Sequence, residues 1–129
     1  HDELHTLLAG DKRFAEHASV PSMAECMQQH DLAILGGGIM LFEAATCALP
    51  TLSIASEDFE RLNIQWAEDR GITRFAAGGQ PASADVIGAA ARSLLENAEE
   101  RRIMSELGPQ VVDGRGGQRI AQIIKGLYN

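Results

Sequence analysis

The sequence predicts one domain of the α/β class, with an open parallel sheet and flanking helices. Residues 32–35 (LAIL) and 51–55 (TLSIA) are short, wholly apolar runs, typical of parallel strands buried on both faces. Segments with helical apolar spacing alternate with these runs, which favours right-handed strand–helix–strand units. At 129 residues and 45% hydrophobic composition, residues 1–129 suffice for a single Rossmann-like domain with its own core.

Each element follows from local signals along the chain. A short helix is expected over residues 3–9, ending at Gly10, and residues 14–20 (FAEHASV) alternate enough to predict a strand. The next helix should begin at Pro21, with Ser22 near its amino end. The remaining expected elements are a glycine turn at 36–38, helices over 40–48, 83–97, 99–107 and 118–127, a loop with N-cap chemistry at 56–58 followed by a helix that ends at Gly71, a strand at 72–76, a loop at 78–81, and breaks at Pro109 and 113–117.

Several side chains are expected in the interior. Trp66 is predicted to pack between helix and sheet, with Leu62 on the apolar face of the same helix. The methionines are predicted core fillers, and the two cysteines are predicted buried thiols rather than a disulfide. These residues are Met23, Met27, Met40, Met104, Cys26 and Cys47.

Charge and composition exclude several classes of function. The net charge of −7 argues against binding of nucleic acid or an anionic membrane. No apolar run approaches the roughly 20 residues of a membrane span, and the four histidines show no metal-ligand spacing, so neither a metal nor a cofactor is expected. The polar start at His1 lacks a methionine and a signal peptide. We therefore expect a fragment of a longer, cytoplasmic protein.

The chemistry is expected where residues 32–35 run into Gly36, Gly37 and Gly38. Ligands of open α/β sheets bind beyond the carboxyl ends of the strands. Glycines let the backbone approach a ligand, and the following helix offers free N–H groups to a phosphate. The sequence lacks both GxGxxG and the lysine of a P-loop, so spacing alone leaves a purely structural turn equally open.

Glu43 lies a few residues beyond the glycines. A carboxylate here would repel a phosphate but could accept hydrogen bonds from two ribose hydroxyls. By itself, the position also fits a solvated helix residue or a local cap.

Together, these stretches resemble the C-terminal domain of GT-B nucleotide-sugar enzymes. The similarity is greatest to UDP-sugar hydrolases of the pseudaminic acid pathway and their spore-coat-polysaccharide relatives, and more distant to MurG-like glycosyltransferases. The stretches that carry it are VPSMAE (20–25), HDLAI (30–34), GG followed by Glu43, LPTL (49–52), Asn63 before Gly71, and VDGRGGQRI (112–120).

The resemblance implies a UDP-sugar-binding half of a hydrolase or glycosyltransferase of glycan biosynthesis. Ser19 and Val20 would flank the base, Gly37, Gly38 and Ile39 would approach the diphosphate, Glu43 would hold the ribose, and Glu60 and Asn63 would lie near the diphosphate or sugar. The water-activating or acceptor-binding residues would belong to a missing N-terminal domain. The chain alone would then be inactive, with no catalytic residue assigned.

Three positions depart from the family pattern, and the first two support an alternative. Met40 stands where the family has Thr or Ser, Glu60 where it has Gln, and Ala48 where it has Gly. Met40 removes a hydroxyl that could bind phosphate, and Glu60 adds a negative charge near the diphosphate or sugar. The alternative is therefore a non-catalytic binding or assembly module with a degenerate site.

Overall fold

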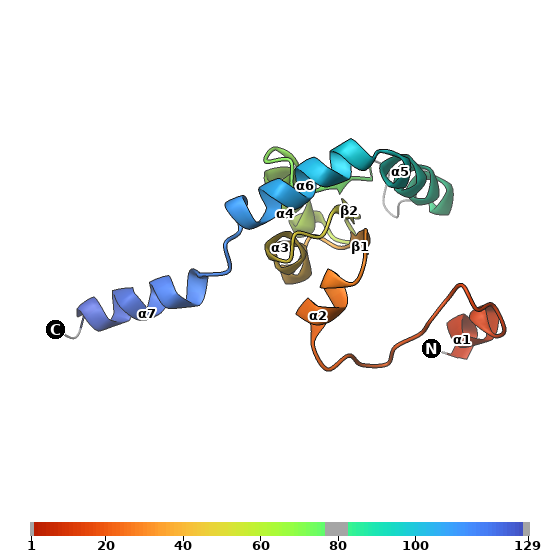
Figure 1. Ribbon diagram of the computed structural model, residues 1–129, viewed down its shortest axis with the longest axis horizontal. Coiled ribbons are helices and arrows are strands. Elements are labelled where there is room, and N and C mark those ends of the chain that lie inside the picture. Colours follow the sequence, from red (N-terminus) through yellow and green to blue (C-terminus); the bar gives the residue numbers. More distant parts are fainter. Residues whose placement is uncertain (1, 77–82, 128–129) are drawn as a thin grey trace.

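The protein is described here by a computed structural model that covers residues 2–76 and 83–127, so the predicted loop at 78–81 lies outside the described residues. The elements run along the chain as follows: α1 (Asp2–Leu8), α2 (Met23–Gln28), β1 (Ala33–Leu35), α3 (Ile39–Thr46), β2 (Thr51–Ser53), α4 (Asp58–Glu68), β3 (Arg74–Phe75), α5 (Ala84–Glu96), α6 (Ala98–Val111) and α7 (Gly116–Leu127) (Figure 1).

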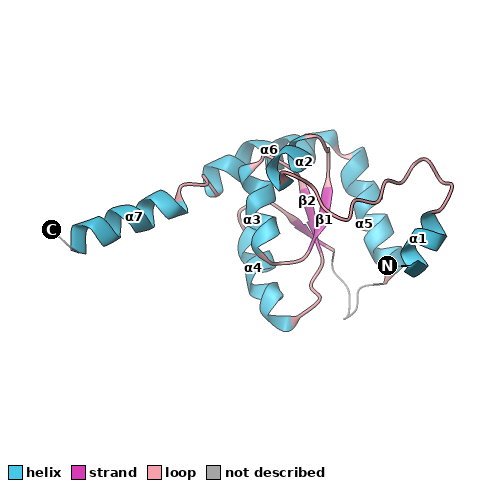
Figure 2. Cartoon of the chain, turned by 90° about the horizontal axis from the view of Figure 1, so that it is seen from below, coloured by secondary structure: helices cyan, strands magenta, loops and turns pink. Residues whose placement is uncertain are grey.

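The three strands form one parallel sheet in the order β1-β2-β3. Ala33 pairs with Thr51 in the first ladder, and Leu52 pairs with Arg74 in the second. Figure 2 shows α3 and α4 on one side of these short strands and α5 on the other. The predicted class, an open parallel α/β sheet with flanking helices, is confirmed.

The strand predicted at residues 14–20 is wrong. These residues belong to an irregular connection between α1 and α2, and all of them except Val20 are exposed. A strand needs a hydrogen-bonded neighbour, and the neighbour of β1 in the described sheet is β2. Residues 14–20 pair with no strand of the described sheet, so the alternation of FAEHASV does not produce a strand.

The core consists of apolar clusters on the helix-covered faces. One joins α3 and α4 to the chain around Ile72, with Leu41, Ile64 and Ala67 almost fully buried. A second joins β2 to α5 and α6 through Leu52, Leu94 and Met104. The helix α6 contacts both clusters, because Leu107 also packs against the first. The core therefore positions α3 and α4, the two helices that begin at the site described below.

Several expected core residues lie at the surface instead. Trp66 is 39% exposed, contacts Phe42 edge to face, and carries the Arg70 guanidinium 4.0 Å above its ring. Leu62 is also exposed, because α4 turns Ile64 and Ala67 inward. Among the methionines, Met27 and Met104 are buried as predicted, whereas Met23 and Met40 are exposed. Cys26 and Cys47 are free thiols and only half-buried.

Pro109 does not interrupt the chain as predicted. The helix α6 continues through it to Val111, where the Val112 N–H donates to the carbonyl of Gly108. A residue before proline avoids the helical region mainly because its Cβ and N–H meet the proline ring. Gly108 has no Cβ, so part of that clash is missing.

The end of α3 has a left-handed residue that is not glycine. Ala48 has a φ of 59°. The N–H groups of Ala48 and Leu49 donate to the carbonyls of Ala45 and Ala44, which is the Schellman pattern that usually places glycine at this position. The Ala48 methyl group therefore strains the turn before Pro50.

Ala48→Gly is expected to stabilise the protein by about 1 kcal/mol, because glycine adopts positive φ without the steric cost of a Cβ. Chemical denaturation of both proteins would measure the difference. Ala89→Gly, at an exposed helical position of α5, is the control and should destabilise by about 1 kcal/mol. Destabilisation by both substitutions would contradict the strain at Ala48.

The two ends of the described chain extend away from the body. Both views show α7 projecting beyond α6, and α1 lying at the other end of the molecule (Figures 1 and 2). The terminal helix and its apolar face are present as predicted, but Ile120, Ile123 and Ile124 are exposed. Across residues 2–76 and 83–127, no helix combines the length and apolar character that a membrane crossing requires.

Candidate functional site

Two helices begin at the edge of the sheet where β1 and β2 end. Gly36–Gly38 lead from β1 into α3, and residues 54–57 lead from β2 into α4. Because the strands are parallel, their carboxyl ends lie at the same edge, where ligands of open α/β sheets bind. The first N–H groups of a helix have no partner inside it. This edge therefore has two positions where an anion could bind. They differ in whether a side chain of the protein already fills them.

The amino end of α3 is open. Gly38 is the N-cap, and no side chain caps this end. A Cβ placed on Gly38 would meet nothing within 4 Å, and the next residue, Ile39, is 77% exposed. Helix amino ends carry a partial positive charge of about half an elementary unit. Gly38 and Ile39 therefore present an accessible, anion-favouring surface.

The amino end of α4 is occupied by its own side chain. The Glu60 carboxylate accepts the N–H of Ser56 at 2.7 Å and that of Glu57 at 3.1 Å. A Cβ on Gly36 would lie only 2.7 Å from the Glu60 Oε1 atom. The carboxylate is thus lodged between α4 and the glycine turn.

Gly37 provides the closest contact between the turn and α4. A Cβ here would lie 2.5 Å from the Glu60 carbonyl oxygen and 2.9 Å from Ile64 Cγ1. The Asn63 side-chain amide donates to the Gly37 carbonyl oxygen at 2.8 Å. Gly37, Glu60 and Asn63, predicted to share a ligand, therefore do come together, but through contacts with one another.

A local signal in the sequence could have revealed the role of Glu60. A glutamate three residues after an N-cap is the second half of a capping box. Glu57 is that N-cap, and Glu60 is the third helical residue of α4. The Asn63 contact joins residues 26 positions apart and has no such local signal.

Glu43 lies one turn beyond the amino end of α3 and is exposed. It lines a hollow of about 260 Å³ between α2 and α3, together with Met23, Met27 and Thr46. Met40, one turn earlier, lines an adjoining, largely apolar hollow that is also bounded by Met23 and Met27. Glu43 is therefore accessible on the side of α3 that faces α2.

Ser19 and Val20 line a different hollow. Its other walls come from His17 in the connection before α2, from Ser22 and Glu25 at the start of α2, and from Gln29 and His30 at its end. The helix expected to begin at Pro21 begins at Met23, and Ser22 is its N-cap, accepting the Glu25 N–H at 3.2 Å. Glu43 lies in the hollow on the α3 side of α2, so these two parts of the predicted site do not share one pocket.

The loop after α6 borders the hollow of Glu43. Thr46 donates its hydroxyl to the carbonyl of Val112 at 3.1 Å, and Gly114, with a φ of 70°, lies against the Thr46 methyl group. A side-chain hydrogen bond from Arg119 and a backbone N–H from Arg115 hold the pKa of Asp113 well below its usual range. The predicted turn at 113–117 is present only as a short loop, because α7 already begins at Gly116.

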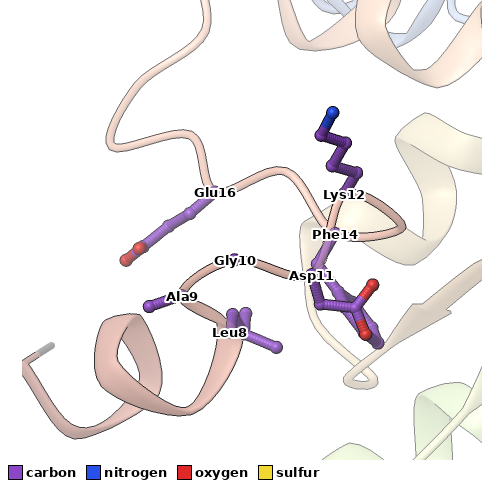
Figure 3. A pocket seen from close by; sticks show the side chains of 7 residues that line it. All are labelled: Leu8, Ala9, Gly10, Asp11, Lys12, Phe14 and Glu16. Carbon is purple, nitrogen blue, oxygen red and sulfur yellow. The ribbon is translucent and has the colours of Figure 1, made fainter.

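A further hollow lies apart from this edge, in the amino-terminal arm. Figure 3 shows its walls, which come from one continuous segment between Leu8 and Glu16. None of the predicted site residues belongs to it. Within the described ranges, no three His, Cys, Asp or Glu side chains are grouped as a metal site requires.

Comparison with known proteins identifies a relative among curated sequences. The chain is 26% identical over 106 residues to the Bacillus subtilis (strain 168) protein named "Spore coat polysaccharide biosynthesis protein SpsG". The aligned region covers 82% of this chain and 31% of SpsG, so the chain spans about a third of the relative's length. No protein-family model matches, and no solved structure matches. The sequence is thus similar to a spore-coat polysaccharide biosynthesis protein, as the resemblance to that group predicted.

Proposed function

We propose that this chain is a nucleotide-sugar-binding domain that prefers UDP-sugars and contributes to polysaccharide biosynthesis. The open amino end of α3 at Gly38 is the observation that carries the proposal, because it offers unpartnered amides at the ligand-binding edge of the sheet. The similarity to SpsG supports the biosynthetic context. The diphosphate would lie at Gly38 and Ile39, and Glu43 would accept hydrogen bonds from the ribose.

Hydrolysis or glycosyl transfer would need residues from a second domain. In this proposal, UDP-sugar lies between the present domain and an N-terminal partner domain that supplies the acceptor or the water-activating base. The chain contributes binding of the nucleotide, through backbone amides rather than a metal ion.

A non-catalytic binding or assembly module is the second candidate. Met40 offers no hydroxyl at the first turn of α3, and Glu60 fills the Gly36 side of the turn with its own carboxylate. Both features weaken a diphosphate site. Binding of UDP is the property that separates the two candidates.

Titration of the chain with UDP by calorimetry is expected to show binding, and Glu43→Ala should weaken it about tenfold, since hydrogen bonds to a charged acceptor are lost. The wild-type protein should also bind 2′-deoxy-UDP less tightly than UDP, and Glu43→Ala should abolish that difference. Glu96→Ala, an exposed carboxylate on α5, is the matched control.

Failure to detect UDP binding at millimolar concentration would favour the non-catalytic module. Binding that is unaffected by Glu43→Ala, with the deoxy discrimination retained, would instead contradict the assignment of the ribose to Glu43.

A further inference from the structure

The two helix amino ends at the ligand-binding edge are not equivalent in charge. The end of α3 is uncapped at Gly38, whereas that of α4 holds the Glu60 carboxylate against Ser56 and Glu57. Among the described residues, Glu60 forms no salt bridge with a Lys, Arg or His side chain. An anion that approaches the glycine turn therefore meets a favourable surface at Gly38 and a fixed negative charge beside Gly36.

The orientation of a nucleotide follows from the proposed function, on which this inference rests. If Glu43 holds the ribose, the phosphates run back along α3 toward its amino end. The terminal phosphate is then the one that comes nearest to the glycine turn and thus to the Glu60 carboxylate, whose Oε1 atom would lie 2.7 Å from a Cβ on Gly36. The extra charge of a free terminal phosphate would be placed next to this carboxylate.

Free UDP and a UDP-sugar differ in this charge. A terminal phosphate monoester has a second pKa of about 6 and carries nearly two charges above pH 7. The same phosphate carries a single charge when it is esterified to a sugar. A carboxylate several ångströms away in a half-exposed site repels the additional charge. Even after screening by salt, this repulsion lowers the affinity for the free diphosphate several-fold relative to the esterified one.

We propose that Glu60 is a specificity-determining residue, which makes the site prefer an esterified diphosphate over free UDP. The carboxylate caps α4 and simultaneously repels the second charge of an unesterified terminal phosphate. A domain built in this way retains a UDP-sugar and releases the UDP that remains after the sugar is removed.

The test compares UDP with its β-methyl ester, which lacks one charge and, like UDP, contains no sugar other than the ribose. At pH 7.5–8, wild-type protein should bind the ester about fivefold more tightly than UDP. Glu60→Gln retains an oxygen that can accept the Ser56 and Glu57 N–H groups but removes the charge. In this variant, the affinities for the two probes should lie within about twofold of each other.

Glu57→Gln is the matched control, because Glu57 precedes the same helix and is exposed; it should retain most of the preference. The melting temperature without nucleotide checks that both variants fold. Equal binding of UDP and its ester by the wild type, or a preference that survives Glu60→Gln, would overturn the role of Glu60 while leaving nucleotide binding intact. Absence of binding for both probes in both proteins would overturn the proposed function itself.

Discussion

Gly108→Ala is expected to lower the free energy of unfolding by about 2 kcal/mol, although alanine is the better helix former. A Cβ on Gly108 would lie 2.4 Å from the carbonyl oxygen of Ala45, so α6 would have to move away from α3. The new methyl group would also meet the ring of Pro109, which disfavours a helical residue before it. Together, these two destabilising effects exceed the stabilisation of about 1 kcal/mol that the higher helix propensity of alanine would give.

Gly88→Ala is the matched control for this substitution. Gly88 lies inside α5, and a Cβ here would meet nothing within 4 Å. The same change should therefore stabilise the protein by about 0.5–1 kcal/mol through helix propensity alone. Urea denaturation of the two variants should give shifts of opposite sign. Stabilisation by Gly108→Ala would contradict the close approach of α3 and α6.

Gly37→Ala is expected to lower the free energy of unfolding by about 1–3 kcal/mol. The added methyl group would overlap with the Glu60 carbonyl oxygen, Glu60 Cβ and Ile64 Cγ1, all at less than 3.0 Å. Because two of these atoms belong to the backbone or to Cβ, rotation of a side chain cannot relieve the overlap. The amino end of α4 would have to separate from the turn, and the Asn63 hydrogen bond to the Gly37 carbonyl would weaken.

Gly38→Ala tests nucleotide binding at the same turn without a large change in the free energy of unfolding. Gly38 has extended backbone angles that any residue adopts, and a Cβ there has open space. This variant should unfold within about 1 kcal/mol of the wild type, as expected for a change at an N-cap. If nucleotides bind at this position, the methyl group should nevertheless weaken UDP binding. Equal destabilisation by both variants would show that Gly37 has no special contact with α4.

Much of the architecture could be predicted from local signals. The apolar runs that contain β1 and β2, the glycine turn and the start of α5 near Ser83 all appear where expected. Two failures share one cause. The strand at residues 14–20 and the buried Trp66 depended on which neighbours a segment meets, and spacing along the chain does not contain that information. The break at Pro109 failed for a local reason, because Gly108 has no Cβ to meet the proline ring.

The candidate site, too, could be predicted only in part from local signals in the sequence. Glycine after a buried strand, followed by a helix with Glu43, was visible as a pattern, and the turn and the helix lie at the expected edge of the sheet. The pattern did not show that Asn63 holds the Gly37 carbonyl, or that Ser19 and Val20 line a hollow of their own. These contacts join segments that the fold, rather than the local sequence, brings together.

By itself, the sequence determined the class of fold and the alternation of strands and helices from residue 32 onward, because periodicity and turn residues act over a few neighbouring positions. Only the tertiary structure decided what each helix end meets. Packing of α4 against the glycine turn brings Glu60 to Gly36 and leaves Gly38 uncovered. The capping box that places Glu60 at the end of α4 is a local pattern, but the approach of α4 to the glycine turn depends on distances between backbones that are far apart in the chain.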